Sequence, residues 1–195
     1  MQQSPTTRPS LLLRIRDARD KDAWRQFVEV YAPLIYRYAR RCRLQDADAN
    51  DVTQEVLRAV ARASHRLDYD PCQGTFRAWL LTIVRNKLCD WMAKRKERGT
   101  GDPETQKMLD ALPARAEETA WWELEYERRV FAWAAEKVRV DFEGTTWAAF
   151  WQTAIEGKTG KETADMLGLS VGAVYIAKSR VMSRLKEQIL QLQGE

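Results

Sequence analysis

Apolar residues recur at helical spacing along most of the chain, whereas strictly alternating apolar and polar residues are nearly absent. In residues 22–42, for example, Trp24, Phe27 and Tyr31 follow one another at intervals of three or four, as on one face of a helix. Pro33 is expected to kink this helix or to begin a new one. The pattern predicts three long helices in the first half of the chain, at 22–42, 46–67 and 75–98.

The composition changes after residue 98. Residues 99–119 contain glycines, two prolines and an excess of acidic residues, which indicates a linker with room for one short helical turn. Aromatic-rich helices are predicted to follow at 120–138 and 144–157. We therefore expect an all-α fold with two small helical domains, 10–98 and 120–195, joined by a flexible linker. If these domains fold separately, proteolysis should cut first within the linker.

The stretch GKETADMLGLSVGAVYIAKSRVMSRL, residues 160–185, contains two helices with a very short connection. Thr159 or a residue beside it is the expected cap of the first helix, which should span about 159–167. Gly168 follows at the position where a left-handed backbone is cheapest, and Ser170 can cap the second helix. The second helix has an inward apolar stripe formed by Val174, Ala177, Val181 and Leu185. This arrangement predicts a helix-turn-helix whose outer face is free to enter a DNA groove.

The outer face of the second helix combines small, apolar and basic residues. Ser170 and the free N–H groups of the helix start can hold a phosphate, and the basic side chains can reach the DNA backbone. Ala173, Tyr175 and Ile176 are expected to read bases by apolar contact with thymine methyl groups. Arg180 either pairs with a guanine or holds a phosphate, and its distance from the helix start favours the phosphate. The full predicted set of DNA contacts in the helix-turn-helix is Lys161, Ser170, Gly172, Ala173, Tyr175, Ile176, Lys178, Ser179, Arg180 and Arg184.

The formal net charge is +4, and the excess of Lys and Arg lies within residues 1–97. A basic excess of this kind indicates a polyanionic partner or a solvated basic surface, and charge alone does not separate the two. No apolar run approaches the ~20 residues that span a bilayer. The N-terminal stretch MQQSPTTRPS lacks the apolar core of a secretory signal. We therefore expect a cytoplasmic protein that does not insert into membranes.

Cysteine and histidine are too few and too scattered for a metal centre. The chain has three widely spaced cysteines, Cys42, Cys72 and Cys89, and a single histidine, His65. No nucleophile–base pair or phosphate-binding loop is visible either. We therefore expect no metal, no cofactor and no enzymatic activity.

Two segments of the first half, DANDVTQEVLRAVARA and GTFRAWLLTIVRNKLCDWMAKRKER, resemble region 2 of the extracytoplasmic-function (ECF) group of bacterial sigma-70-type factors. The matching features are a polar helix face, a Phe-Arg-x-Trp-Leu segment, an Arg-Asn pair and a terminal basic run. They comprise Asp51, Gln54, Glu55, Phe76, Arg77, Trp79, Leu80, Arg85, Asn86, Lys94, Arg95 and Lys96. The second half resembles region 4 of the same family, so the likeness covers about residues 20–97 and 121–190. Tyr175, Ile176 and Ala177 replace a Lys-Ser-Arg sequence of many members.

The resemblance implies a factor that docks on bacterial RNA polymerase core, recognises two promoter elements and opens the duplex. Residues 10–98 would be region 2, 99–119 the linker and 120–195 region 4. In the family, the polar face on the second helix meets a coiled coil of the largest polymerase subunit, and here that face consists of Asp51, Gln54, Glu55 and Arg58. Contacts with the minus-ten element are expected from Tyr69, Arg77, Arg85, Asn86, Lys87, Lys94, Arg95 and Lys96. Promoter DNA and polymerase core are thus the expected partners, and an anti-sigma factor is a further candidate.

Two other interpretations remain open at the level of sequence. A stand-alone helix-turn-helix regulator would need a ligand pocket or a dimer interface within residues 20–97. A helical adaptor that binds only protein would show no affinity for DNA and no steep dependence on salt.

Overall fold

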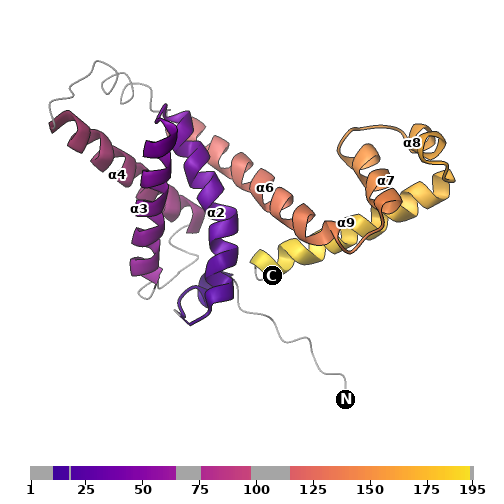
Figure 1. The fold of residues 1–195 in the computed structure, drawn as a ribbon, viewed down its shortest axis with the longest axis horizontal. Coiled ribbons are helices and arrows are strands. Elements are labelled where there is room, and N and C mark those ends of the chain that lie inside the picture. Colours follow the sequence, from indigo (N-terminus) through magenta and orange to yellow (C-terminus); the bar gives the residue numbers. More distant parts are fainter. Residues whose placement is uncertain (1–10, 18, 65–75, 98–114, 194–195) are drawn as a thin grey trace. The chain divides into compact units, whose positions relative to one another are not determined.

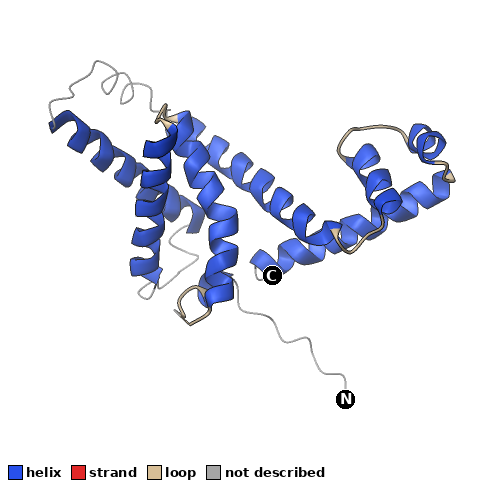
Figure 2. Ribbon diagram, in the orientation of Figure 1, coloured by secondary structure: helices blue, strands red, loops and turns tan. Residues whose placement is uncertain are grey.

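The computed structural model describes residues 11–17, 19–64, 76–97 and 115–193 (Figure 1). All regular elements in these ranges are α-helices, which confirms the predicted all-α class (Figure 2). The helices are α1 (Leu11–Arg14), α2 (Lys21–Arg41), α3 (Asp46–Ser64), α4 (Phe76–Glu97), α6 (Arg115–Arg139), α7 (Gly144–Ala154), α8 (Gly160–Leu167) and α9 (Val171–Gln193).

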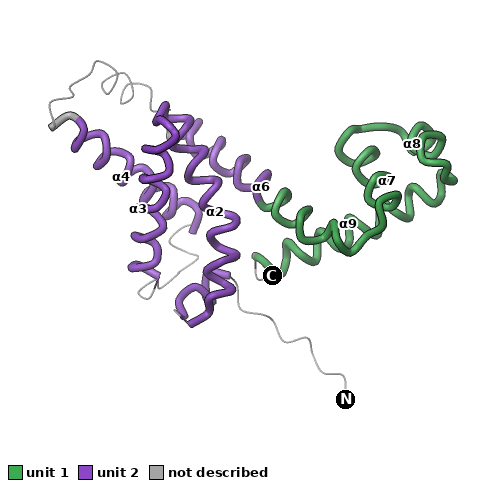
Figure 3. The backbone as a smooth tube through the Cα atoms, viewed as in Figure 1, with its two compact units in different colours: residues 1–10, 130–195 green, residues 11–129 purple. Residues whose placement is uncertain are grey.

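The chain divides into two compact units, and the division falls inside α6, between Arg129 and Val130 (Figure 3). The first unit comprises residues 11–129, and the second comprises the described residues from Val130 onward. Residues 115–119, which the sequence analysis placed in the linker, form the first turns of α6. The remainder of the predicted linker, up to residue 114, lies outside the described residues.

The first unit is built around α2, which packs against α3, which in turn packs against α4 (Figure 1). Asp20 caps α2 by accepting a hydrogen bond from the backbone N–H of Ala23 at 2.8 Å. The helix then runs without interruption to Arg41, so Pro33 does not begin a new helix. The core of these three helices consists of fully buried apolar side chains, among them Phe27, Leu34, Ile35, Val56, Val60, Leu80, Val84 and Leu88.

The first half of α6 belongs to this unit because its aromatic side chains pack on α2. The ring of Tyr126 lies 5.6 Å from that of Tyr31, and the ring of Trp122 lies 5.8 Å from that of Tyr38, edge to face. Trp122 is fully buried. Aromatic pairs of this kind add to the stabilisation from burial, so the helix start is part of the domain core.

The second unit contains the second half of α6 together with α7, α8 and α9. Helix α7 packs on α9, and α8 packs on both of them (Figure 1). A small apolar cluster of Ala149, Ala164, Val174 and Ala177 joins the three helices, with Leu167 and Leu169 packed against it. Small side chains at these positions allow the helices to approach one another closely, and this close packing positions α9.

Candidate functional site

A groove of about 630 Å³ lies between α3 and the end of α4 in the first unit. One wall carries the polar face predicted on α3, and its members Asp51, Gln54, Glu55 and Arg58 are exposed. These positions share a face because they are three or four residues apart, whereas Val52 and Val56 between them point into the core. The guanidinium of Arg58 bridges the side chains of Glu55 and Gln54.

The opposite wall of this groove is formed by Trp91, Lys94 and Arg95 of α4. The Arg95 guanidinium lies 5.2 Å from the centre of the Trp91 ring and contacts the carboxylate of Asp48 on α3 at 3.4 Å. The structure therefore brings the predicted polymerase-binding face together with two of the predicted minus-ten residues. The groove thus has an acidic wall on α3 and a basic wall on α4, and the ion pair between Arg95 and Asp48 connects the two walls.

Two further arginines of α4 contact carboxylates of α6. Arg77 donates a hydrogen bond from Nε to Glu123 at 2.6 Å and lies 4.7 Å above the ring of Tyr126. Burial opposes the charge of Arg77, but the hydrogen bond and the charge of Glu123 outweigh it and raise the pKa of the guanidinium. Arg85 donates to the carboxylate of Glu118.

Glu118 is buried, with 3% of its surface exposed, and it also accepts a hydrogen bond from the hydroxyl of Tyr38. Burial, reinforced by this hydrogen bond, raises the pKa of the Tyr38 hydroxyl far above its ordinary value, so the hydroxyl remains a donor. Glu125 is buried as well and forms ion pairs with Arg37 at 2.9 Å and Arg129 at 3.4 Å. A buried carboxylate is tolerated because such partners compensate its charge.

The remaining residues predicted for the minus-ten element differ in their surroundings. Asn86 and Lys94 are exposed, and Lys87 forms an ion pair with Asp90 at 3.6 Å. Tyr69 and the side chain of Lys96 lie outside the described residues.

The turn between α8 and α9 in the second unit has the geometry predicted from the sequence. Thr159 and Glu162 form a capping box, in which the Thr159 hydroxyl accepts from the Glu162 N–H and the Glu162 carboxylate accepts from the Thr159 N–H. Gly168 ends α8 in the left-handed conformation with φ of 65°. Ser170 then caps α9 by accepting from the N–H of Ala173 at 3.1 Å. All four residues of the predicted inward stripe are buried.

The outer face of α9 is the second candidate surface. Gly172, Tyr175, Ile176, Ser179 and Arg180 are exposed, as are Ser170 at its start and Lys161 on α8, whereas Ala173 and Lys178 are half-buried. Arg184 differs from these residues because its guanidinium already has acidic partners. Its Nε donates to Asp141 at 3.0 Å and its Nη1 donates to Glu187 at 3.4 Å. The ring of Tyr175 lies against Gly160, the first residue of α8.

Comparison with known proteins identifies the family. A model of sigma-70 region 2 matches residues 27–98. The ECF RNA polymerase sigma factor ShbA of Streptomyces griseus subsp. griseus is 32% identical over 79% of this chain and 81% of its own length. The chain belongs to the ECF RNA polymerase sigma factors.

Two further known proteins are similar to this chain. The ECF RNA polymerase sigma factor RpoE of Cereibacter sphaeroides is 22% identical over 92% of this chain and 93% of its own. A solved structure, that of CnrH in complex with the cytosolic domain of CnrY, matches 91% of this chain and 93% of the other, with 25% identity and a TM-score of 0.36. Family membership confirms the sigma-factor interpretation over the stand-alone regulator and the adaptor.

In this sigma factor, the range matched by the region 2 model contains most of α2 and all of α3 and α4, and therefore both walls of the charged groove. Sequence reasoning missed that Glu118 contacts α4, because it interpreted residues up to 119 as a linker. The spacing of Glu118, Trp122, Glu125 and Tyr126 at intervals of three or four could have indicated a buried helix face continuing upstream of residue 120.

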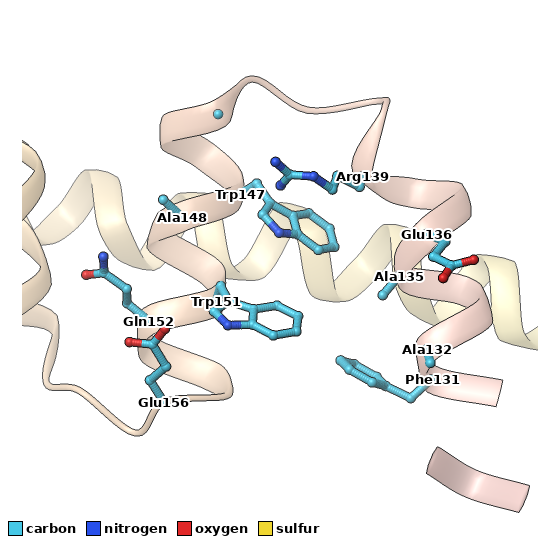
Figure 4. Close-up of a pocket in the computed structure, with 11 residues that line it drawn as sticks. Phe131, Ala132, Ala135, Glu136, Arg139, Trp147, Ala148, Trp151, Gln152 and Glu156 are labelled. Carbon is cyan, nitrogen blue, oxygen red and sulfur yellow. The ribbon is translucent and has the colours of Figure 1, made fainter. Parts of the chain in front are cut away.

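Sequence reasoning also missed an aromatic groove between the second half of α6 and α7. Figure 4 shows the rings of Trp147 and Trp151 pointing from α7 toward Phe131 and Ala135 of α6. The groove has a volume of about 730 Å³, and the guanidinium of Arg139 lies 5.4 Å from the centre of the Trp147 ring at one end. The four-residue spacing of the two tryptophans was the available signal.

The described residues contain no group of His, Cys, Asp and Glu side chains arranged to hold a metal ion. None of the described helices combines the length and the apolar composition needed to cross a bilayer.

Proposed function

We propose that this sigma factor divides its work between the two surfaces described above. The exposed face of α3, with Asp51, Gln54, Glu55 and Arg58, binds the polymerase core. The basic end of α4, which includes Lys96, binds the minus-ten element together with Tyr69, which lies outside the described residues. The outer face of α9 binds the minus-thirty-five element. In this proposal residues 10–98 act as region 2, 99–119 as the linker and 120–195 as region 4.

The observation that carries the proposal is the charged groove. Its α3 wall exposes the residues that the family resemblance assigns to polymerase, and its α4 wall exposes Lys94 and holds Arg95. A protein docked on α3 would therefore lie directly beside the basic end of α4. This adjacency supports coupling between polymerase binding and contact with promoter DNA.

Arg77 and Arg85 have a different status within the proposal. Both contact carboxylates of α6, so a phosphate would have to compete with Glu123 or Glu118 for the charge of the arginine. Arg184 has a similar constraint, because its guanidinium already contacts Asp141. The exposed residues Asn86 and Lys94 on α4 and Arg180 on α9 face no such competition.

The chain itself catalyses no reaction in this proposal and acts in the cytoplasm, where it delivers polymerase to promoters. The polymerase supplies the chemistry. What this chain supplies is binding energy and orientation for the two promoter elements.

In vitro transcription with purified polymerase core on a library of random promoters tests the overall assignment. The expected result is core-dependent initiation at promoters that share two separated elements. Initiation without this protein, or no initiation with it, would contradict the assignment.

A charge-reversed variant, Asp51→Lys with Glu55→Lys, tests the α3 surface specifically. Both residues are exposed, so the helical fold should survive, and affinity for the core should fall by about tenfold or more, equivalent to about 1.4 kcal/mol. The matched control is Asp22→Lys with Glu127→Lys, which makes the same change in net charge at exposed positions outside the groove. Equal core affinity for the two variants would place the polymerase contact elsewhere.

A further inference from the structure

Gly160 and Tyr175 lie on the two consecutive helices of the helix-turn-helix and are in close contact. Gly160 is the first residue of α8, and Tyr175 lies in the second turn of α9. A Cβ atom built on Gly160 would lie 3.0 Å from both Cζ and Oη of Tyr175 and 3.1 Å from its Cε2. Distances of this size are tighter than ordinary contacts, so a methyl group here would require the ring to shift by a few tenths of an ångström.

The backbone of Gly160 does not explain why glycine stands there. The glycines with positive φ in the described residues are Gly157 at 72° and Gly168 at 65°. At these two positions the conformation itself favours glycine. Gly160 has no such conformation, and it begins a helix, where alanine is the better helix former. What distinguishes Gly160 is the phenol ring lying against it.

Tyr175 is only partly covered by this contact. Its side chain is 57% exposed, so one edge of the ring rests on the start of α8 while the rest faces outward with Ile176 and Arg180. A tyrosine in the second turn of a helix has several accessible rotamers when nothing restrains it. In the structure the ring lies over Gly160 at the start of α8.

We propose that Gly160 is a positioning residue for promoter selectivity. Because it has no side chain, the ring of Tyr175 can lie against the start of α8, and this contact fixes where the ring meets the minus-thirty-five element. The inference rests on the proposed function of the α9 face and deepens it. A preformed orientation reduces the conformational entropy lost on binding. It also determines which base pair the ring can contact.

The substitution Gly160→Ala, which adds a single methyl group, tests this positioning role. In Gly160→Ala, the ring of Tyr175 must shift by a few tenths of an ångström, which a terminal side-chain group can do without displacing the backbone. Because alanine also favours the helix, thermal stability should stay close to that of the wild type. The matched control is Gly144→Ala, which places alanine at the first residue of α7, where a Cβ meets nothing within 4 Å.

The ring position is measured first, without DNA. Spectra of the full chain with ¹³C-labelled tyrosine are recorded for the wild type, Gly160→Ala and Gly144→Ala, and the Tyr175 signal is assigned from its loss in Tyr175→Ala. The expected result is a shifted Tyr175 signal in Gly160→Ala alone. An unshifted signal in that variant would show that Gly160 does not set the position of the Tyr175 ring.

Selectivity is measured second, by transcription with polymerase core on promoters that differ at single minus-thirty-five positions. Gly160→Ala should change the preference at one position by about fivefold, the lower end of the range for one base pair. The same substitution should have no further effect in a Tyr175→Ala background. A shifted signal with unchanged preference, while Tyr175→Ala does alter preference, would overturn the positioning role. If Tyr175→Ala itself leaves every preference unchanged, the proposed role of Tyr175 fails, and the inference fails with it.

Discussion

The two candidate surfaces of this sigma factor use their charged side chains differently. In the first unit, Arg77, Arg85 and Arg95 of α4 each contact a carboxylate from a neighbouring helix. On α9 of the second unit, the outer face presents Tyr175 and Ile176 with more than half of each side chain exposed. The first surface is thus largely neutralised within the fold, whereas the second offers apolar area that only a partner can cover.

This difference has consequences for binding. A phosphate that meets Arg77, Arg85 or Arg95 competes with an existing carboxylate, so the gain is smaller than that of a new ionic contact. Apolar contact with thymine methyl groups on α9 removes exposed surface from water and has little dependence on salt. We therefore expect the two promoter elements to respond differently to salt and to single substitutions.

The largest effect is expected where the first unit holds a buried charge. Glu118→Ala leaves Arg85 and Tyr38 without their common acceptor and should lower the free energy of unfolding by about 3 kcal/mol, the lower end of the range for a broken buried pair. Urea unfolding of the full chain, followed by circular dichroism, measures this change. The exposed Glu127→Ala should stay within about 0.5 kcal/mol, and equal values for both variants would contradict the importance of the buried contact.

Arg180→Ala tests whether α9 has an ionic contribution besides its apolar one. If Arg180 holds a phosphate, its loss should weaken binding to all promoters alike, by about 1.5–3 kcal/mol, and reduce the salt slope by about one. If Arg180 instead pairs with a guanine, the loss should appear at one promoter position, at about 1–3 kcal/mol. Titrations across promoter variants at several salt concentrations distinguish these outcomes. Undiminished transcription from every variant would refute both roles.

The cap of α9 should have a smaller effect. Ser170→Ala removes the acceptor of the Ala173 N–H and should cost about 1 kcal/mol of stability. The thermal unfolding temperature of the full chain measures it. Ser183→Ala is the matched control, since this serine is exposed in the interior of α9 and alanine is the better helix former there. If Ser170→Ala is no less stable than Ser183→Ala, the Ser170 hydroxyl contributes nothing to the stability of the fold.

The smallest change in stability is expected for Glu123→Gln, which tests directly whether pairing with a carboxylate limits the contact of an α4 arginine with DNA. Glu123→Gln removes the charge that holds Arg77, and because both side chains are about one-third exposed, stability should change by less than about 1 kcal/mol. The freed guanidinium should strengthen binding of the polymerase complex to single-stranded minus-ten DNA and steepen its salt dependence. Adding Arg77→Gln should abolish the gain. Unaltered DNA binding in Glu123→Gln would show that Arg77 has no part in the minus-ten contact.

The local geometry of the helix-turn-helix could be predicted because its signals are local. Thr159, Gly168 and Ser170 each act within three or four residues, and the inward stripe of α9 follows from the helical period alone. The polar face of α3 could be predicted for the same reason. These elements needed no knowledge of the rest of the fold.

The partners of α6 could not be predicted in this way. Helical periodicity indicates that a face is buried but not what covers it, and the acidic residues near position 118 were interpreted as part of a linker. Glu118 and Glu125 are buried because arginines from α2 and α4 reach them in three dimensions. Ion pairs between residues separated by 33 or more positions leave no pattern in a single sequence.

The sequence by itself thus determined the helical class, the helix-turn-helix and the family resemblance, because periodicity, capping and motif spacing are properties of neighbouring residues. The tertiary structure alone decided that α6 begins inside the first unit, that Arg77 and Arg85 contact carboxylates, and that Tyr175 rests on Gly160. The first two depend on helices that are far apart in the chain, and the third depends on how α8 packs on α9. That packing follows from the whole core, so no short stretch of sequence contains it.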